Sequence, residues 1–163
     1  MNVRQVRPEE HGALADLTVA AYRSLFGPHM DDGYAAELAD VADRTAVADV
    51  LVAVDDEGRL LGGVAYLPTA SAFGWLDGPD EAGIRMLAVD PAAQGRGVGA
   101  RLVAACVERA IADRKTRILL HTTATMTVAH RLYERAGFGR APERDHLLEG
   151  GPLLLAYVLH LER

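Results

Sequence analysis

The residues with the clearest chemical potential form a glycine-rich loop between an expected strand and an expected helix. Glycines alternate with other residues at Gly95, Gly97 and Gly99, and arginines stand at Arg96 and Arg101. Glycine accepts a positive φ and lets backbone N–H groups approach an anion closely. A helix that begins at Gly97 adds unpaired N–H groups and the positive end of its dipole. The sequence therefore predicts an anion site, for which a diphosphate is the natural ligand.

Two familiar nucleotide-binding loops fit this segment poorly. A Walker loop ends in Gly-Lys-Ser/Thr, which is absent here. A dinucleotide fingerprint requires a third glycine where Leu102 stands, and an acidic residue at the end of the next strand, which reads Leu120-His121-Thr122. A simple glycine-rich turn remains the alternative, although such a connector rarely needs three glycines and two flanking arginines.

Hydrophobic patterning predicts the elements that position this loop. Strands are expected where apolar residues alternate or run together, at residues 3–6, 49–54, 60–67, 83–89, 118–120 and 153–161. Helices are expected where apolar residues recur at helical spacing, at residues 9–22, 31–43, 97–113 and 125–136. The turn composition of residues 55–58 predicts an antiparallel hairpin. The order of elements predicts one α/β (α+β) domain over residues 1–163, with a mixed, largely antiparallel sheet flanked by helices.

Composition and charge limit the class of partner. The chain has 163 residues, of which 50% are hydrophobic and 25% charged, as expected of a globular domain. Its net charge of −6 argues against a nucleic-acid partner. Residues 1–93 hold 6 basic and 16 acidic side chains, whereas residues 94–163 hold 11 basic and 7 acidic ones. The basic half contains the glycine loop, which agrees with an anionic ligand.

Other residue classes favour a cytoplasmic protein without a membrane partner or a metal. The longest apolar run, residues 153–159, is far shorter than the ~18 residues that span a bilayer, and residues 1–7 have no signal-peptide pattern. The single cysteine, Cys106, forbids an internal disulfide. The histidines show no metal-ligand spacing, so we expect no metal site.

Two segments resemble the signatures of the GCN5-related N-acetyltransferases, the GNAT family. Residues 94–99, Gln-Gly-Arg-Gly-Val-Gly, are similar to the family's Gln/Arg-x-x-Gly-x-Gly/Ala loop and follow a hydrophobic strand and Pro91. Residues 129–138, Ala-His-Arg-Leu-Tyr-Glu-Arg-Ala-Gly-Phe, resemble its Ala-x-x-Leu-Tyr-Glu-x-x-Gly-Phe signature. Close similarity covers residues 84–138, and the order of elements extends the resemblance over essentially the whole chain.

The resemblance implies acetyl-CoA as cosubstrate. The backbone amides of the loop would hold the coenzyme A pyrophosphate, at Gln94, Gly95, Arg96, Gly97, Val98, Gly99 and Ala100. The preceding strand would separate from its neighbour at a bulge, and the pantetheine arm would pair with the backbone of Leu87, Ala88 and Val89. A core strand would carry the same side chains, so this expectation concerns the backbone alone.

The resemblance also suggests catalytic residues. Tyr133 would be the general acid that protonates the coenzyme A thiolate, or simply a buried aromatic on the apolar stripe of its helix. The resemblance does not assign a general base, because Gly83 stands where many family members have a glutamate. Glu81 has the same strand parity and could act through a water, or could be a solvated residue at the start of the strand. His121 titrates near neutrality but could equally be a polar end to its strand. Met126 replaces an asparagine that hydrogen-bonds pantetheine in many members, so that contact is not expected.

The implied activity is N-acetyl transfer from acetyl-CoA to a primary amine by direct attack in a ternary complex. The acceptor would be a small molecule or a peptide, and the acidic first half mildly favours a cationic amine. Phe73 and Trp75 could line its pocket or merely fix their loop. A homodimer is compatible with the resemblance. The alternative is a catalytically silent acyl-CoA-binding module, which Gly83 and Met126 suggest.

Overall fold

A mixed sheet forms the centre of the computed structural model, which describes residues 1–27, 30–70 and 75–161. The sheet runs in the order β1-β2-β3-β4-β5-β8-β6, and β7 also pairs with β8. Its strands are β1 (Asn2–Gln5), β2 (Asp49–Val54), β3 (Leu60–Leu67), β4 (Glu81–Val89), β5 (Arg117–Thr123), β6 (Gly139–Arg140), β7 (His146–Leu147) and β8 (Leu153–His160). Among the described residues only β4 and β5 pair in parallel. The expected mixed, largely antiparallel sheet is confirmed, and a doubly wound nucleotide-binding sheet is excluded.

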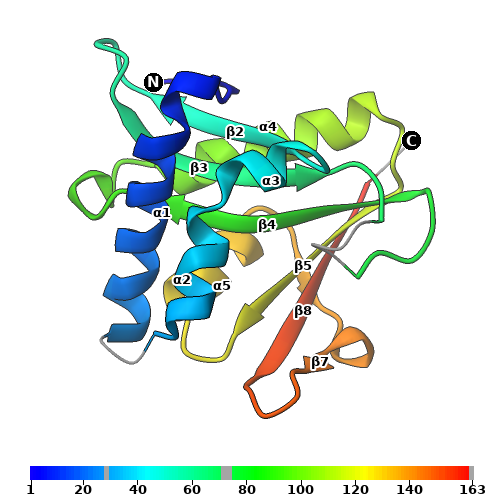
Figure 1. Ribbon diagram of the computed structural model, residues 1–163. Coiled ribbons are helices and arrows are strands. Elements are labelled where there is room, and N and C mark those ends of the chain that lie inside the picture. Colours follow the sequence, from blue (N-terminus) through cyan, green and yellow to red (C-terminus); the bar gives the residue numbers. More distant parts are fainter. Residues whose placement is uncertain (28–29, 71–74, 162–163) are drawn as a thin grey trace.

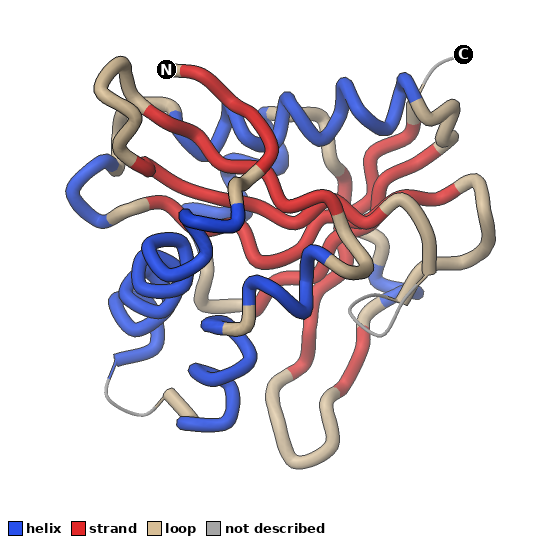
Figure 2. Tube along the Cα trace, turned by 45° about the horizontal axis from the view of Figure 1, so that its top comes forward, coloured by secondary structure: helices blue, strands red, loops and turns tan. Residues whose placement is uncertain are grey.

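Helices cover both faces of this sheet (Figures 1 and 2). They are α1 (His11–Phe26), α2 (Asp32–Ala39), α3 (Val41–Thr45), α4 (Val98–Ala112) and α5 (Thr127–Arg135), with short 3₁₀ turns at Pro8–Glu10, Pro91–Ala93 and Pro142–Arg144. The apolar residues of α1 and α2 pack with one set of sheet side chains, and those of α4 and α5 pack with another. The sheet therefore separates two apolar cores. No helix in the described part of the chain is long and apolar enough to span a membrane.

Most expected elements are confirmed, with shifted ends. The hairpin strands at 49–54 and 60–67 are found as expected. The strand expected at 118–120 extends over Arg117–Thr123, because it pairs with β8 along its whole length. The single helix expected at 31–43 is wrong. Asp40, at φ −84° and ψ 71°, ends α2 and accepts a hydrogen bond from the Asp43 N–H, which starts α3.

The two parallel strands separate after three residue pairs. Glu81, Ala82 and Gly83 of β4 pair with β5, and beyond them the two strands diverge (Figure 1). On its other edge β4 pairs with β3 through a bulge: Ala65 lies opposite Arg85 and Gly63 opposite Ala88. Thus one residue of β3 faces two of β4, which bends the bulged strand away. The bulge and the separation that the resemblance implied are both present.

The bulge also changes which side chains share a face. Met86 has a φ of +55°, which is costly for a residue with a side chain. Arg85 forms an ion pair with Glu37 of α2, and Met86 packs in the core of α1 and α2. Two consecutive side chains therefore lie on the same side of the sheet, whereas regular alternation would place them on opposite sides.

Candidate active site

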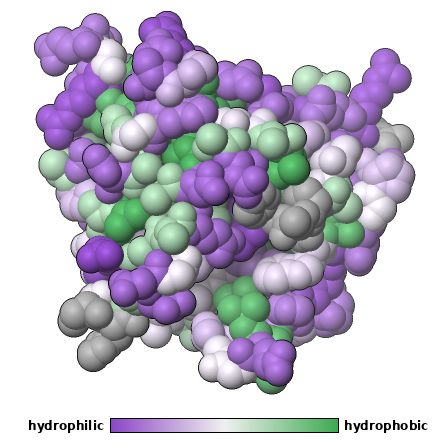
Figure 3. All heavy atoms as spheres, in the orientation of Figure 1, coloured by the Kyte–Doolittle hydropathy of each residue, from purple (hydrophilic) through white to green (hydrophobic). Residues whose placement is uncertain are grey.

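A cavity of about 830 Å³ occupies the gap between β4 and β5. On one face of the sheet it is lined by α1 and α2, and on the other it reaches Tyr133 of α5. Its middle is formed by residues 83–87 of β4 and 119–123 of β5. On the face that Figure 1 presents, apolar patches lie among polar residues (Figure 3). One continuous cavity thus connects the two faces, and its size suits a small-molecule site.

The glycine loop has the conformation that its sequence predicts. Gly95 and Gly97 both have a φ of +79°, and a Cβ at either position would meet no atom within 4 Å. Gly97 is the N-cap of α4 and supplies no side-chain hydrogen bond to the first turn of that helix. Arg96 and Arg101 are exposed and form no ion pair among the described residues. The loop is therefore open to solvent, with helix N–H groups and two exposed arginines within about one helical turn of Gly97.

Gly99 has a different part in the same loop. A Cβ there would lie 3.0 Å from Leu132 of α5 and 3.7 Å from Val89 of β4. Its lack of a side chain lets the first turn of α4 lie close against both elements. Gly99 thus joins the loop physically to the second sequence signature, which contains Leu132.

Tyr133 of α5 lines one end of the cavity. Its side chain is 5% exposed, and burial raises the pKa of its hydroxyl above the ordinary value. Its ring packs near Phe138 and Tyr157, with centroid distances of 5.9 and 6.2 Å. Among the described residues, no group hydrogen-bonds its hydroxyl. Tyr133 is therefore a buried aromatic and also a neutral phenol that can donate a proton into the cavity.

Glu81 occupies a different setting from either that the sequence suggested. It is fully buried, so a solvated strand-start residue is wrong. Arg144 donates to both carboxylate oxygens at 2.6 Å, Arg117 donates at 2.7 Å, and the Asp77 N–H donates at 3.1 Å. Burial raises the pKa of this carboxyl, but the guanidinium hydrogen bonds outweigh burial and hold the pKa below its ordinary value. Since Glu81 also does not line the cavity, it is poorly suited to be a water-relayed base.

Two further expectations about the base concern Gly83 and His121. A Cβ on Gly83 would lie 3.1 Å from the Leu76 side chain, so leucine partly fills the space that a glutamate would use. His121 lines the cavity, and its Nε2 lies 2.9 Å from the carbonyl oxygen of Arg144. Burial lowers the pKa of His121 below 6.5. Trp75 also lines the cavity, with its ring edge-on to His121 at 5.1 Å, whereas Phe73 lies outside the described residues.

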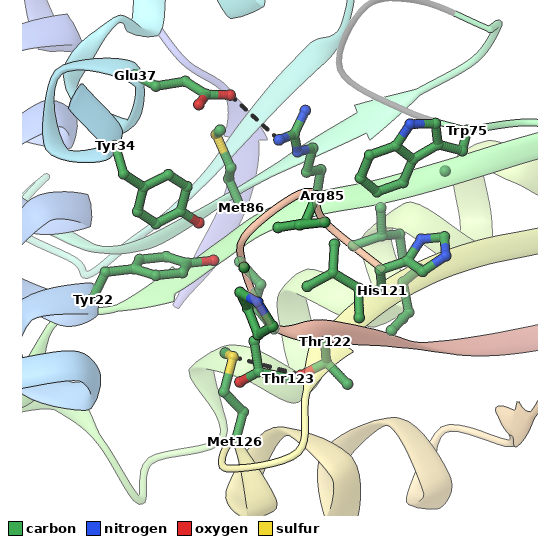
Figure 4. A pocket seen from close by; sticks show the side chains of 18 of the residues that line it. Tyr22, Tyr34, Glu37, Trp75, Arg85, Met86, His121, Thr122, Thr123 and Met126 are labelled. Atoms are coloured by element: carbon green, nitrogen blue, oxygen red, sulfur yellow. Dashed lines mark hydrogen bonds and ion pairs between the residues drawn. The ribbon is translucent and has the colours of Figure 1, made fainter. Parts of the chain in front are cut away.

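The opposite end of the cavity contains residues that the sequence did not single out. Tyr22 of α1 and Tyr34 of α2 direct their hydroxyls into it, and burial raises both pKa values (Figure 4). Arg85 and Glu37 form an ion pair of 3.3 Å at the same end. These residues come from three separate elements, so helical and strand periodicity gave no signal that they would meet.

Comparison with known proteins agrees with this arrangement. Residues 12–138 match the model of the acetyltransferase (GNAT) family. The chain belongs to the GNAT family. It is 34% identical over 127 residues to a mycothiol acetyltransferase of Mycobacterium sp. (strain JLS), covering 71% of this chain and 39% of the relative. The chain thus spans about two fifths of the length of that curated relative.

Solved GNAT structures share the fold of this family member. An acetyltransferase of Staphylococcus aureus Mu50 superposes with a TM-score of 0.76 at 14% identity, covering 99% of both chains. A GNAT acetyltransferase of Brucella melitensis, solved in complex with acetyl-CoA, superposes with a TM-score of 0.68 at 22% identity. That match covers 99% of this chain and 88% of the other. At these identities the likeness concerns the fold alone.

Replacing Glu81 by glutamine should lower the free energy of unfolding by about 3 kcal/mol, because Arg144 and Arg117 lose a buried charged partner. The pKa of Glu81 is lowered on folding, so its stabilisation is present above its unfolded pKa near 4.5 and is lost as the pH falls through the folded value. Urea unfolding across pH should show a constant difference near neutrality that shrinks under acid. The exposed turn residue Glu57 gives the control, Glu57→Gln, with a change below about 0.5 kcal/mol. An equally small, pH-independent effect at Glu81 would contradict the assignment.

Proposed function

We propose that the protein is an acetyl-CoA-dependent N-acetyltransferase that transfers the acetyl group directly to a primary amine. The observation that carries this proposal is the gap between β4 and β5, which gives one cavity access from both faces of the sheet. A thioester and an amine can approach each other through such a gap from opposite sides. Membership of the GNAT family supports the reaction class.

The cofactor side would use mainly backbone groups. The pyrophosphate would bind the N–H groups of residues 94–100, at the positive end of α4 and between Arg96 and Arg101. The pantetheine arm would lie along Leu87–Val89, because the β5-facing edge of β4 has no β-sheet pair beyond Gly83 in the described chain. Acetyl-CoA in the Brucella melitensis relative supports this choice of cosubstrate.

Transfer would follow from this placement. The amine nitrogen attacks the thioester carbon, and backbone N–H groups at the bulge near Leu87 stabilise the oxyanion. When the tetrahedral intermediate collapses, the C–S bond breaks and its electron pair stays on sulfur. Tyr133 then donates a proton to the thiolate. The acceptor and the acetyl group react directly, without an acyl-enzyme.

The acceptor would be a small-molecule or peptide amine that binds at the α1 and α2 end of the cavity. The hydroxyls of Tyr22 and Tyr34 and the ion pair of Arg85 with Glu37 are the polar groups there. The name of the curated relatives, mycothiol acetyltransferase, favours a small molecule. The deciding experiment measures thiol release from acetyl-CoA with amino acids, polyamines, aminoglycosides and peptides with free N-termini. We expect release above background with at least one amine, together with calorimetric binding of CoA.

Two negative results have different meanings. CoA binding without thiol release from any amine would favour the catalytically silent acyl-CoA-binding module, the alternative suggested by Gly83 and Met126. Absence of CoA binding would overturn both the transferase and the module.

The substitution Gly97→Asp should raise the Kd for CoA at least about tenfold, because it places a carboxylate at the anion-binding end of α4. Aspartate tolerates the left-handed conformation at a cost of about 1 kcal/mol, so the fold should survive. Gly58→Asp is the matched control, since Gly58 has a φ of +81° and open space but lies in the β2–β3 turn. Calorimetry on both variants gives the comparison, and equal affinities for CoA would rule out pyrophosphate binding by the loop at residues 94–100.

Replacing Tyr133 by phenylalanine should lower kcat by about 100-fold while leaving the Kd for CoA unchanged, because only the proton donor is lost. Tyr157→Phe is a suitable control. Tyr157 is buried beside Tyr133 but does not line the cavity. The measurement is steady-state kinetics with an amine that the protein acetylates. Full turnover in Tyr133→Phe would show that Tyr133 is not the general acid.

A further inference from the structure

His121 lies on β5 immediately beyond the point where β4 and β5 separate. The last β4–β5 pair joins Gly83 to Leu119, and His121 is two residues further on, so it shares the face of Leu119. Leu119 packs with Leu76, whereas Leu120 packs in the core that contains Tyr133. His121 is therefore on the face of the gap where the acceptor is proposed to bind, opposite to Tyr133, the proposed general acid.

The hydrogen bond of His121 determines which nitrogen carries the lone pair. Its Nε2 lies 2.9 Å from the carbonyl oxygen of Arg144, and a carbonyl can only accept. The proton of the neutral ring must therefore be on Nε2, which leaves the lone pair on Nδ1. Burial lowers the pKa of His121, so the neutral ring predominates near neutral pH. A cavity-lining imidazole with a free lone pair can accept a proton.

The residue that supplies this carbonyl is held in place by its side chain. The Arg144 side chain forms two hydrogen bonds of 2.6 Å to Glu81 and one of 3.2 Å to the Trp75 carbonyl. Glu81 is further held by Arg117 of β5 and by the Asp77 N–H. The buried carboxylate therefore anchors the Pro142–Arg144 turn to the sheet. The Trp75 ring, stacked on His146 at 4.3 Å, contacts His121 edge-on.

Few charged groups surround the imidazole. The segment 144–146 presents Arg144 and His146, which lower its pKa, and Asp145, which raises it. The facing part of β4 carries Glu81 and Arg85, both in ion pairs, with Gly83 between them. On β8 the partner of His121 is alanine, at position 156.

We propose that Nδ1 of His121 is the general base that deprotonates the acceptor, and that Glu81 and Arg144 are positioning residues that fix its tautomer. This inference rests on the proposed acetyl transfer. The acceptor ammonium gives one proton to Nδ1, and the imidazolium then releases it to solvent. The free amine forms the C–N bond, the C–S pair passes to sulfur, and Tyr133 protonates that sulfur. The nitrogen loses a second proton as the amide forms, and this proton restores the neutral phenol of Tyr133. The products are therefore an amide, CoA thiol and one proton.

The test compares His121→Gln with a matched variant, His130→Gln. Glutamine can still donate to the Arg144 carbonyl but has no basic lone pair. His130 makes the same kind of bond, 2.8 Å from its Nε2 to the Thr123 carbonyl, and His130 itself does not line the cavity. The substrate is spermidine or the panel amine that is acetylated fastest. With it, kcat/KM of His121→Gln should fall about 100-fold or more. The decrease of kcat/KM toward low pH, the acidic limb of the pH profile, should also disappear. The Kd for CoA should not change, and His130→Gln should keep the unaltered pH profile.

Glu81→Gln tests the positioning role. The charge of Arg144 would then lack its buried partner, so the acidic limb should move to lower pH. A purely structural role for Glu81 would alter stability and leave the pH profile in place, which would overturn the positioning part of the proposal.

A second measurement does not depend on the acceptor. Nitrogen-15 NMR of the unaltered protein near neutral pH should show a neutral His121 ring protonated on Nε2. A charged ring, or a proton on Nδ1, would overturn the base even in an active enzyme, as would a fully active His121→Gln variant. Failure of every amine to release thiol from the unaltered protein would instead overturn the proposed transferase function, and the base with it.

Discussion

The site depends on the early separation of the two parallel strands, β4 and β5. Their pairing stops after Gly83, and the bulge in β4 that follows puts Met86 at a φ of +55°. Such strain persists only where the surrounding structure compensates for it. Here the compensation comes from the β3 pairing on both sides of the bulge and from packing of Met86 against α1 and α2. The result is a fixed opening in an otherwise continuous sheet.

An ion pair joins β4 and β5 at the end where the two strands are still paired. Glu81 and Arg117 form the first β4–β5 pair, and their side chains form an ion pair of 2.7 Å across the two strands. Arg144 binds the same carboxylate from the Pro142–Arg144 turn, which contacts His121 through its last carbonyl. One buried carboxylate thus holds together the paired ends of β4 and β5 and also the turn whose carbonyl bonds a cavity-lining imidazole. Its burial is tolerable because two guanidinium groups satisfy both oxygens.

Sequence patterns identify what is contiguous, and miss what folding brings together. The loop at residues 94–100 and the helix with Tyr133 are local motifs, so their geometry could be predicted. The Arg144 partner of Glu81 is 63 residues away in the chain, and no periodicity connects the two. Alternation also fails at the bulge, where Arg85 and Met86 share one face. For the same reason the acidic excess of residues 1–93 is a weak guide to the acceptor, since Glu37 in the cavity is already paired with Arg85.

The placement of nucleophiles favours direct transfer over an acyl-enzyme. Cys106, the single cysteine of the chain, is 1% exposed, does not line the cavity, and has a pKa raised by burial to about 12. Its thiol is therefore neutral and out of reach of a thioester in the gap. Among the groups that line the gap are the phenol of Tyr133 on one face and the imidazole of His121 on the other. Because the sheet keeps these two apart except at the opening, proton removal from an amine and proton delivery to a thiolate can proceed at separate ends of one cavity. The proposed direct transfer would need both steps and no intermediate on the protein, and this arrangement would serve it.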